Sequence, residues 1–555
     1  MSGKGKTYYC PLDLEPIDMN NLAYELAFGV GFTAEKAEED KKFKELTSVG
    51  DESLIEKSEE RRKTIFGFED EETCLIVLEN GTPGGDSGLS FLIDNVKYNG
   101  QAGSEAATDE QKDYGLDMST AIKAAQDEKS STRKIRPSGN RGFQRPSDLG
   151  NFNLVDVRND EEGNYTFYNN VGQYVMTALP CCPHCHMRLP IDWGKAEDFL
   201  IVSLFAPTGS GKTTMLLSLM ANKWEALEKY SSINGSQLQV TPANYSAGGG
   251  FYKKMSGLAD NLRNNGNCPD PTGKEKMIQP LFLNVNYNGH RMLVGIYDNA
   301  GENLEDPNVI HKYYLKTVID NSDVDMFLFD PEDMNINLDR KVFDMKSLKK
   351  SLPNCTVDDI KEQGEKQASA GNKRIPAREI LDEACKGTEK GIKEERTKKG
   401  PLDVYRAVSR VRGLRKSAQA KQNSRRFLGV IIKSDLLRPV IKNEEYSELF
   451  RDVRVDPSNR NQVSTTSNTI TDMIKEYKLF GDLDDKEIDV IGSKYNEVRR
   501  SWHCISALGC DAEMHGQLKG KYAPIRLAEP IIRCIVDRIA DNGWIDENSG
   551  RGGNK

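Results

Sequence analysis

The sequence contains no hydrophobic run that approaches the roughly 20 residues of a membrane-spanning helix. Its first residues, Met-Ser-Gly-Lys-Gly-Lys, include no apolar signal core. A large excess of positive charge is also absent, because 76 Lys and Arg are balanced by 85 Asp and Glu, which gives a net charge of -9. This balance argues against a globally basic nucleic-acid binder. We therefore expect a soluble, cytoplasmic protein without a membrane partner, and nucleic acid is disfavoured as a partner.

The 11 cysteines lack the paired spacing of a disulfide framework, because most of them stand singly. Only residues 181–186, which read Cys-Cys-Pro-His-Cys-His, concentrate sulfur and imidazole. Cys182 and Cys185 have the spacing of a zinc knuckle, in which two thiolates three residues apart bind one tetrahedral ion. A complete site needs four ligands, so two more must come from elsewhere.

No second pair of cysteines with this spacing is present. Cys10-Pro-Leu-Asp13 has the same shape, but Asp13 stands where the second cysteine would be. Other side chains could fill the gap instead, namely Cys181, His184 and His186. Two interpretations stay open. One is a zinc site with ligands from Cys182, Cys185, Cys10, Cys181 and His186, and the other is a ribbon that has lost its metal.

The chain has 555 residues, of which 37% are hydrophobic, so two to four domains are expected. Within the N-terminal part we predict an exposed helix over residues 34–64 and short strands at 74–78 and 89–96. The segments expected in chain order are an N-terminal α+β region (1–99), a linker or mobile insertion (100–150), a β segment with the knuckle (151–195), an α/β domain (196–545) and a disordered tail (546–555).

The strongest signal is a phosphate-binding loop, Ala206-Pro-Thr-Gly-Ser-Gly-Lys-Thr213, which follows an apolar strand predicted over 199–205 and precedes a helix. Its glycines let backbone N–H groups point at phosphate oxygens. The lysine can reach the outer phosphates, and the Thr213 hydroxyl can ligate Mg²⁺. Ala206 replaces the usual first glycine. The loop residues expected at the nucleotide are Thr208, Gly209, Ser210, Gly211, Lys212, Thr213 and Thr214, of which Thr208 and Thr214 fit structural roles better.

Strands and helices alternate after this loop, which predicts a mostly parallel sheet with helices on both faces. Asn288-Gly289 is a strong hairpin signal and adds one antiparallel strand. The remaining elements are expected over 324–329, 427–432 and 504–508 for strands and over 470–479 and 529–539 for helices.

Polar residues follow these strands in the order that a nucleotide switch needs. Asp298-x-x-Gly301 supplies a carboxylate for Mg²⁺ and an N–H for the terminal phosphate, and Glu302 could orient the attacking water. In Lys433-Ser-Asp435, the Asp435 carboxylate can accept two hydrogen bonds from guanine.

Two further stretches complete this set. Ser506-Ala507-Leu508 follows a predicted strand and can close over the base. Thr241, expected in a loop, is a candidate for the threonine that senses the γ-phosphate and ligates Mg²⁺. Lys212 and Glu302 are the expected catalytic residues.

This ordered set resembles the TRAFAC class of P-loop GTPases. The stretch Cys182-Pro-His-Cys185-His-Met-Arg-Leu189-Pro190 is similar, more narrowly, to the double-GTPase family of bacterial conflict systems. The resemblance covers about residues 180–545 and implies a Ras-like fold, GTP and Mg²⁺ as cofactors, slow hydrolysis and control of a partner protein. This chain departs from the pattern at Ile432, where Asn or Thr is usual, and at Glu302, where many members have Gln.

The resemblance also assigns roles residue by residue. It places Lys212 and Thr213 at phosphate and Mg²⁺, and Asp298 and Gly301 in the third GTPase motif. The base is assigned to Asp435 together with the loop Ser506, Ala507 and Leu508.

Residues 335–425 are too long and too charged for a simple connection. Val404, Val408 and Val411 recur at helical spacing. One interpretation is a packed helix with a solvated basic face, and the other is a docking surface for an acidic partner or RNA. The basic residues concerned are Arg406, Arg410, Arg412, Arg415 and Lys416.

Two other functions remain open from the sequence. One is an ATP-dependent P-loop enzyme, in which Lys433-Ser-Asp435 is accidental and the acidic residues come from Asp330-Pro-Glu332-Asp333. The other is a scaffold that holds nucleotide as a structural ligand and works through its zinc knuckle and N-terminal region.

Overall fold

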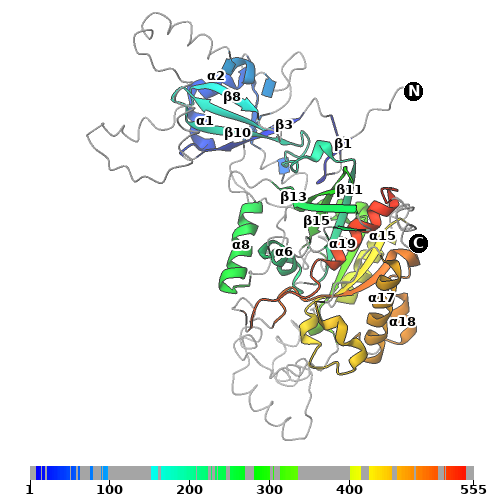
Figure 1. The fold of residues 1–555 in the computed structure, drawn as a ribbon. Coiled ribbons are helices and arrows are strands. Elements are labelled where there is room, and N and C mark those ends of the chain that lie inside the picture. Colours follow the sequence, from blue (N-terminus) through cyan, green and yellow to red (C-terminus); the bar gives the residue numbers. More distant parts are fainter. Residues whose placement is uncertain are drawn as a thin grey trace, which may run out of the picture. The chain divides into compact units, whose positions relative to one another are not determined.

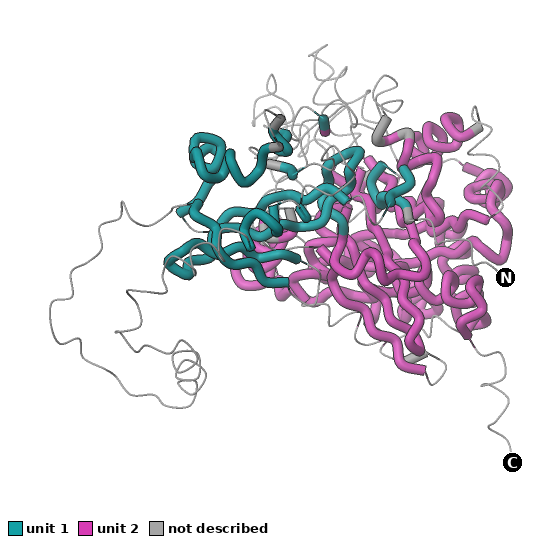
Figure 2. The backbone as a smooth tube through the Cα atoms, turned by 90° about the horizontal axis from the view of Figure 1, so that it is seen from above, with its two compact units in different colours: residues 1–61, 73–189 teal, residues 62–72, 190–555 magenta. Residues whose placement is uncertain are grey.

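The protein is described by a computed structural model (Figure 1). Its chain divides into two compact units, residues 1–61 with 73–189 and residues 62–72 with 190–555 (Figure 2). The structure describes residues 8–13, 15–18, 22–29, 31–49, 52–57, 61–62, 76–78, 89–90, 92–97, 152–159, 164–207, 209–222, 227, 230, 232–233, 236–244, 251–268, 280–299, 304, 313–334, 401–413, 424–452, 459–480, 483–510, 518 and 520–545.

Several predictions from the sequence fall outside these residues. They concern the expected linker at 100–150, most of the charged segment 335–425 and the tail 546–555. Among the described helices, each is too short or too polar to cross a membrane.

The first unit contains a six-stranded antiparallel sheet in the order β6-β7-β3-β10-β9-β8. Segments far apart in the sequence are neighbours in it, since Leu26 is paired with Ala178. The core beside the sheet is rich in aromatic rings, with Phe43 and Phe152 5.3 Å apart. The strands are β3 (Ala23–Phe28), β6 (Ile55–Lys57), β7 (Ile76–Leu78), β8 (Leu154–Asn159), β9 (Tyr165–Asn169) and β10 (Tyr174–Cys181), with two small sheets formed by β1 (Tyr8–Tyr9) and β2 (Pro16–Ile17) and by β4 (Ser48–Val49) and β5 (Glu52–Ser53).

The single exposed helix predicted over 34–64 is wrong. Two short helices, α1 (Ala34–Glu39) and α2 (Lys41–Leu46), are separated at Asp40, whose carboxylate accepts a hydrogen bond from the Phe43 N–H at 2.9 Å. Strands follow these helices. Asp40 ends one helix and caps the next because its side chain competes for backbone N–H groups.

The strand predicted over 89–96 is also wrong, because the described residues of 89–97 are helical. Leu89, Leu92 and Val96 are buried there. Their spacing of three and four residues is the period of a helix that packs on one side.

The second unit is built on an eight-stranded mixed sheet in the order β12-β13-β14-β15-β11-β16-β17-β18. The strands from β15 to β18 in this order pair in parallel, and the pairings among β12, β13, β14 and β15 are antiparallel. The chain is thus mixed α/β. The predicted mostly parallel sheet with one antiparallel strand is found only in part, because three of the pairings in this sheet are antiparallel and antiparallel pairings predominate over all described sheets. The strands are β11 (Asp198–Phe205), β12 (Ser232–Ile233), β13 (Ser236–Pro242), β14 (Leu281–Tyr287), β15 (His290–Asp298), β16 (Val324–Phe329), β17 (Arg426–Ile431) and β18 (Arg500–Cys504).

The predicted hairpin at Asn288-Gly289 is confirmed. Both residues have positive φ, 51° and 86°, as a two-residue turn between twisted strands requires. The last strand, in contrast, covers residues 500–504 and not 504–508 as expected. Beyond Cys504 the chain leaves the sheet, and Ser506 instead forms an isolated bridge with Ile525.

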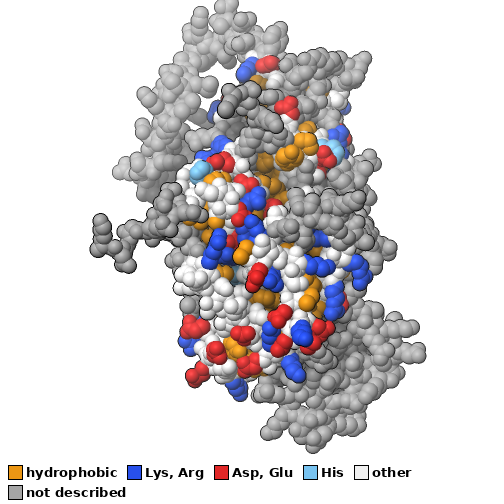
Figure 3. Space-filling view, turned by 90° about the vertical axis from the view of Figure 1, so that its right-hand side faces the viewer, with side chains coloured by type: hydrophobic (Ala, Val, Ile, Leu, Met, Phe, Trp, Pro, Cys, Tyr) orange, Lys and Arg blue, Asp and Glu red, His pale blue; other side chains and the backbone are white. Residues whose placement is uncertain are grey.

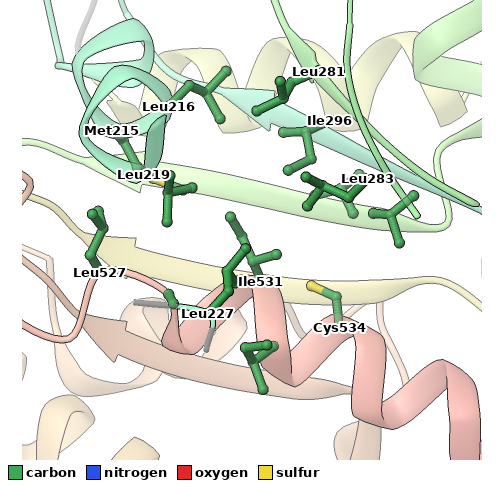
Figure 4. Packing of buried hydrophobic residues seen from close by; sticks show 14 of the residues in the cluster. Met215, Leu216, Leu219, Leu227, Leu281, Leu283, Ile296, Leu527, Ile531 and Cys534 are labelled. Carbon is green, nitrogen blue, oxygen red and sulfur yellow. The ribbon is translucent and has the colours of Figure 1, made fainter. Parts of the chain in front are cut away.

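Helices cover both faces of this sheet. Side chains of α6 (Lys212–Ala221) and α19 (Glu529–Asp541) meet the strands in one apolar cluster (Figure 4). Leu204 belongs to this cluster. The next residue, Phe205, is on the other face of the sheet, where its ring centroid lies 5.2 Å from that of Phe327. The remaining helices are α8 (Phe251–Asn265), α10 (Tyr313–Asn321), α15 (Pro401–Gly413), α17 (Arg460–Glu476) and α18 (Asp485–Val490).

Helix α15 is the described part of the charged segment. Val404, Val408 and Val411 are buried, which confirms the predicted apolar stripe. Arg412 does not belong to a solvated basic face, because it is 4% exposed and its guanidinium bonds the buried Asp325 carboxylate. Arg415 and Lys416 lie outside the described residues.

Candidate functional site

The phosphate-binding loop connects β11 to α6. Gly209 and Gly211 have φ values of 79° and 88°, in the left-handed region that favours glycine. The Ser210 hydroxyl donates to the Pro207 carbonyl at 2.8 Å, which closes the turn. Thr208 lies outside the described residues.

Lys212 folds back over this loop. Its ammonium donates to the carbonyls of Ala206 and Pro207, at 2.9 Å each, and the residue is 7% exposed. Thr214 is partly buried in the first turn of α6. A cation is thus fixed at the positive end of a helix, an arrangement that attracts an anion such as phosphate.

Thr213 and Asp298 come together although they are 85 residues apart. The Thr213 hydroxyl donates to Asp298 Oδ2 at 2.6 Å. Asp298 Oδ1 is buried and has no hydrogen-bond partner among the described residues, and the same holds for Oδ1 of the next residue, Asn299. Burial raises the pKa of Asp298, although Lys212 and the Thr213 hydroxyl act in the opposite direction. Such a carboxylate beside a hydroxyl is suited to a hard divalent cation.

Gly301 and Glu302 follow this carboxylate in the sequence. Both lie outside the described residues, so their predicted roles at the terminal phosphate and the attacking water stay predictions.

Thr241 does not lie in a loop, contrary to the prediction. It is an exposed residue of β13, where it pairs with Asn284, which in turn pairs with Leu293. Leu293 is five residues before Asp298 on β15. At about 3.3 Å per residue and 4.8 Å per strand, Thr241 is on the order of 20 Å from Asp298. Thr241 and Asp298 therefore cannot ligate the same ion in this structure.

Two loops from neighbouring parallel strands meet at the candidate base site. Asp435 lies in the short helix η7 (Ser434–Leu436) after β17, and Ser506 follows β18. The Ser506 hydroxyl donates to Asp435 Oδ1 at 2.5 Å and accepts from the Gly509 N–H at 2.8 Å. The carboxylate is thus held in one orientation. The two residues between Ser506 and Gly509 in the chain are Ala507, which is buried, and Leu508, which is half-buried.

Ile432 links this base site to the phosphate loop by an apolar contact. It is fully buried, and a Cβ placed on Gly211 would lie 3.4 Å from its Cδ1. An Asn or Thr at this position could form a hydrogen bond with the phosphate loop, whereas the side chain of Ile432 can only make apolar contacts.

The acidic residues after β16 have a role that the sequence did not reveal. The Lys433 ammonium lies 2.5 Å from Asp330 Oδ2 and 2.6 Å from Glu332 Oε2. From the sequence alone, these carboxylates are possible acids of an ATP-dependent enzyme. The signal in the sequence was an acidic cluster directly after a fully buried strand, but its partner could not be identified without the fold.

The first unit contains a cluster of potential metal ligands. The side-chain ligand atoms of Cys10, Asp13, Cys182 and Cys185 all lie within 4.8 Å of one another, and all four residues are buried. Cys10 Sγ is 3.7 Å from Cys185 Sγ, and Cys182 Sγ is 3.6 Å from Asp13 Oδ2. This donor set could hold a metal ion such as zinc, because it offers three sulfurs and a carboxylate at tetrahedral-site spacing.

Protonation differs among the three thiols of this cluster. The hydrogen bonds from Cys10 and Cys185 lower the pKa of Cys182 to about 3, whereas burial raises the pKa of Cys10 and of Cys185 well above the usual range. A metal that binds here would have to displace the protons that burial favours on Cys10 and Cys185.

The structure does not bring Cys181 or His186 into this cluster. Cys181 is the last residue of β10, and its side chain packs with Ala23 and Val77. His186 Nε2 is instead 2.9 Å from the Arg61 guanidinium. The fourth member of the cluster is Asp13, which the sequence analysis does not predict as a ligand.

His184 lies beside the cluster. Its Nδ1 is 2.8 Å from Asp13 Oδ2, and its side chain is half exposed. It is placed to orient the carboxylate from outside, as second-layer histidines and carboxylates do in metal sites.

In the second unit, the described residues that the sequence analysis predicts to contact nucleotide follow β11, β15, β17 and β18. The first unit contains a buried cluster of potential metal ligands. Comparison of the chain with protein-family models and with curated proteins found no significant match.

Proposed function

We propose that the second unit is a GTP-binding switch that hydrolyses GTP slowly with Mg²⁺ and controls a partner protein. The strand order β14-β15-β11-β16-β17-β18, with helices on both faces, agrees with the Ras-like fold that the sequence resemblance implies. The loops that would touch nucleotide all follow carboxyl ends of strands that pair in parallel, where ligands bind in open α/β sheets.

The observation that carries this proposal is the pairing of residues from distant loops into two preformed sites. Thr213 bonds Asp298 beside Lys212, and Ser506 bonds Asp435. The first pair fits a phosphate with its divalent cation, and the second fits a base that offers adjacent N–H donors. Guanine offers such donors and adenine does not.

In the proposed cycle, Lys212 and the N-terminus of α6 neutralise the phosphate charge that develops in the transition state. Thr213 and Asp298 would hold Mg²⁺, which supplies electrostatic stabilisation when bound. Glu302 would orient the attacking water. Binding to a conflict-system partner would follow from rearrangement of the segment after Asp298 with the γ-phosphate.

The ATP-dependent alternative receives less support. It assigns the acidic residues to Asp330 and Glu332, whose carboxylates hold Lys433. The hydroxyl of Thr213 contacts Asp298 instead.

A phosphate-release assay tests the proposed activity. We expect slow release from GTP in Mg²⁺, loss of release in EDTA, and loss in Thr213→Ala. Release that continues undiminished in Thr213→Ala and EDTA would overturn the assignment of this residue to the metal.

For the first unit we propose structural Zn²⁺ at Cys10, Asp13, Cys182 and Cys185. The support is that all four ligand atoms converge in a buried position. Metal analysis of the purified protein should give about one zinc per chain, reduced in Cys185→Ser but not in Cys268→Ser. Equal zinc in both variants, or none in the wild type, would contradict the proposal.

A further inference from the structure

Three titratable side chains are buried together next to the base loop (residues 506–508). His503 belongs to β18, Arg526 precedes α19, and Glu529 is the first residue of that helix. Their exposed fractions are 1%, 4% and 3%. A buried charge is costly unless it is paired, so these side chains depend on one another.

Glu529 is the centre of this cluster. Its carboxylate accepts hydrogen bonds from Arg526 Nε at 2.7 Å and Nη2 at 2.8 Å, and its Oε1 lies 3.0 Å from His503 Nδ1. Burial by itself raises the pKa of Glu529, but the hydrogen bond from His503 and the charge of Arg526 outweigh burial and lower it. The paired bonds from one guanidinium fix both the position and the orientation of the Arg526 side chain, which a lysine ammonium cannot do.

The main chain at Arg526 is also held in place. Its φ is 52°, in the left-handed region that residues with a Cβ rarely adopt. Its N–H donates to Asp452 Oδ1 at 3.1 Å. An unfavourable backbone conformation persists only where surrounding contacts maintain it, and here the contacts are those with Asp452 and Glu529.

Arg526 directly follows the residue that supports the base loop. The Ser506 N–H donates to the Ile525 carbonyl at 3.0 Å, and the Ile525 N–H donates to the Ser506 carbonyl at 2.9 Å. The Ser506 hydroxyl in turn donates to Asp435 Oδ1. A continuous chain of contacts therefore connects the buried cluster, through the main chain of Ile525, to the carboxylate proposed to read guanine.

We propose that Arg526 is a positioning residue for guanine recognition, which Glu529 and His503 hold so that the base loop presents Asp435 in one orientation. This inference rests on the proposed function. The three side chains are buried, so they act through Ile525 and Ser506 and need no contact with the nucleotide. Disturbing the cluster should therefore weaken binding of the base and leave the phosphate loop unaffected.

The test compares two ligands in Mg²⁺, namely GTP and inorganic tripolyphosphate, which has the phosphates but no base. Arg526→Lys keeps the positive charge and removes the paired contact with Glu529. We expect this variant to bind GTP about tenfold more weakly and to bind tripolyphosphate within about twofold of the wild type. In a Ser506→Ala background, Arg526→Lys should weaken GTP binding by less than about a further twofold, because the link to Asp435 is already lost.

Arg533→Lys is the matched control. It disturbs another buried ion pair of α19, between Arg533 and Asp537 at 2.7 Å, about two helical turns beyond Arg526. We expect both ligands to bind this control within about twofold of the wild type, even if its stability falls. Hydrogen exchange of the nucleotide-free protein gives a second measurement, in which the amides of Ser506 and Ile525 should exchange faster in Arg526→Lys than in Arg533→Lys.

Two results would overturn the inference while leaving the proposed function intact. One is unchanged GTP affinity in Arg526→Lys, even with a lower melting temperature, since the cluster would then be merely structural. The other is an equal loss of affinity for GTP and tripolyphosphate. A wild-type protein that binds tripolyphosphate but not GTP would instead overturn the proposed function, and the inference with it. If Arg526→Lys does not fold, His503→Leu removes one partner of Glu529 and should show a smaller loss for GTP alone, and the absence of that loss would also contradict the inference.

Discussion

The pKa of the buried Asp298 carboxylate links the stability of the protein to the candidate cation site. Its pKa is raised chiefly by burial, so the ionised form destabilises the metal-free protein at pH values above that pKa. This penalty is full above the raised pKa, shrinks as the pH falls below it, and is gone below the pKa of the unfolded chain, where the carboxyl group is neutral in both states.

We therefore predict that Asp298→Asn stabilises the metal-free protein by about 1 kcal/mol at neutral pH. The amide oxygen can still accept the Thr213 hydroxyl. Thermal unfolding in EDTA should show the gain at pH 7 and a smaller difference in acid. The same variant should lose at least about tenfold in Mg²⁺-dependent GTP affinity. A variant that is less stable at pH 7, or that keeps full Mg²⁺-dependent binding, would refute this account of the site.

Ser506 is predicted to act through Asp435. Its hydroxyl fixes one carboxylate oxygen at 2.5 Å, and Ser506→Ala removes this constraint. A lost hydrogen bond to a charged group corresponds to about 1.5–3 kcal/mol, so GTP affinity should fall at least about tenfold while ATP affinity changes little. Thr469→Ala, which removes a helical hydroxyl bonded to the Thr465 carbonyl, is the matched control. Equal effects in both variants would argue against preorganisation of the carboxylate.

At the scale of elements, α15 is anchored beneath the sheet by a buried ion pair. Arg412 bonds both Asp325 carboxylate oxygens, and Tyr495 donates to Asp325 Oδ2 at 2.5 Å. Arg412→Met leaves that carboxylate buried without its countercharge, which should cost about 3–5 kcal/mol in unfolding free energy. Arg406→Met removes an exposed pair with Asp403 on the same helix and should cost under about 1 kcal/mol. Chemical denaturation measures both, and similar losses would contradict the prediction.

The elements also show what a sequence can reveal about this fold. Buried strands that pair in parallel are continuous apolar runs, and β16 was placed at residues 324–329 for that reason. Apolar residues in a short segment fit a strand and a helix equally well, so the strand predicted over 89–96 is wrong and the described residues of this segment are helical. In β13 the burial does alternate along Ser236–Pro242, and Thr241 is on the exposed side, so the loop predicted for Thr241 overlooks a strand signal that the sequence contains.

Some residues of the candidate sites can be predicted from the sequence, and others cannot. Residues beside a motif, such as Lys212 and Asp298, were identified because strand ends in a sheet converge. Asp13 is not predicted as a ligand from the sequence, because its place in the cluster depends on contact with Cys182, which is 169 residues away along the chain. The contact of Lys433 with Asp330 depends on the pairing of β16 with β17, which local patterns do not specify.

At the scale of the whole molecule, the charges are mixed. On the face drawn in Figure 3, basic and acidic side chains of the described residues are interspersed. A continuous basic patch of the kind that binds nucleic acid is not seen among the described residues on this face, in line with the net charge of -9.

The two units have separate cores, so metal removal should act on one of them. We predict that a strong chelator lowers the temperature of one unfolding transition by several degrees, since a structural metal contributes directly to folding. Calorimetry with and without chelator, on the wild type and on Cys185→Ser, makes the measurement. A chelator effect that persists undiminished in Cys185→Ser would show that the metal lies elsewhere.

The central claim is that the second unit binds guanine nucleotide through Lys212 and Asp435. The most direct measurement is the binding of fluorescent GTP and ATP analogues, with Mg²⁺, to the wild type and to Lys212→Ala and Asp435→Ala. We predict tight binding of GTP but not ATP, with GTP binding lost in both variants. Equal binding of the two nucleotides that is indifferent to Asp435→Ala would contradict the claim and favour an ATP-dependent enzyme.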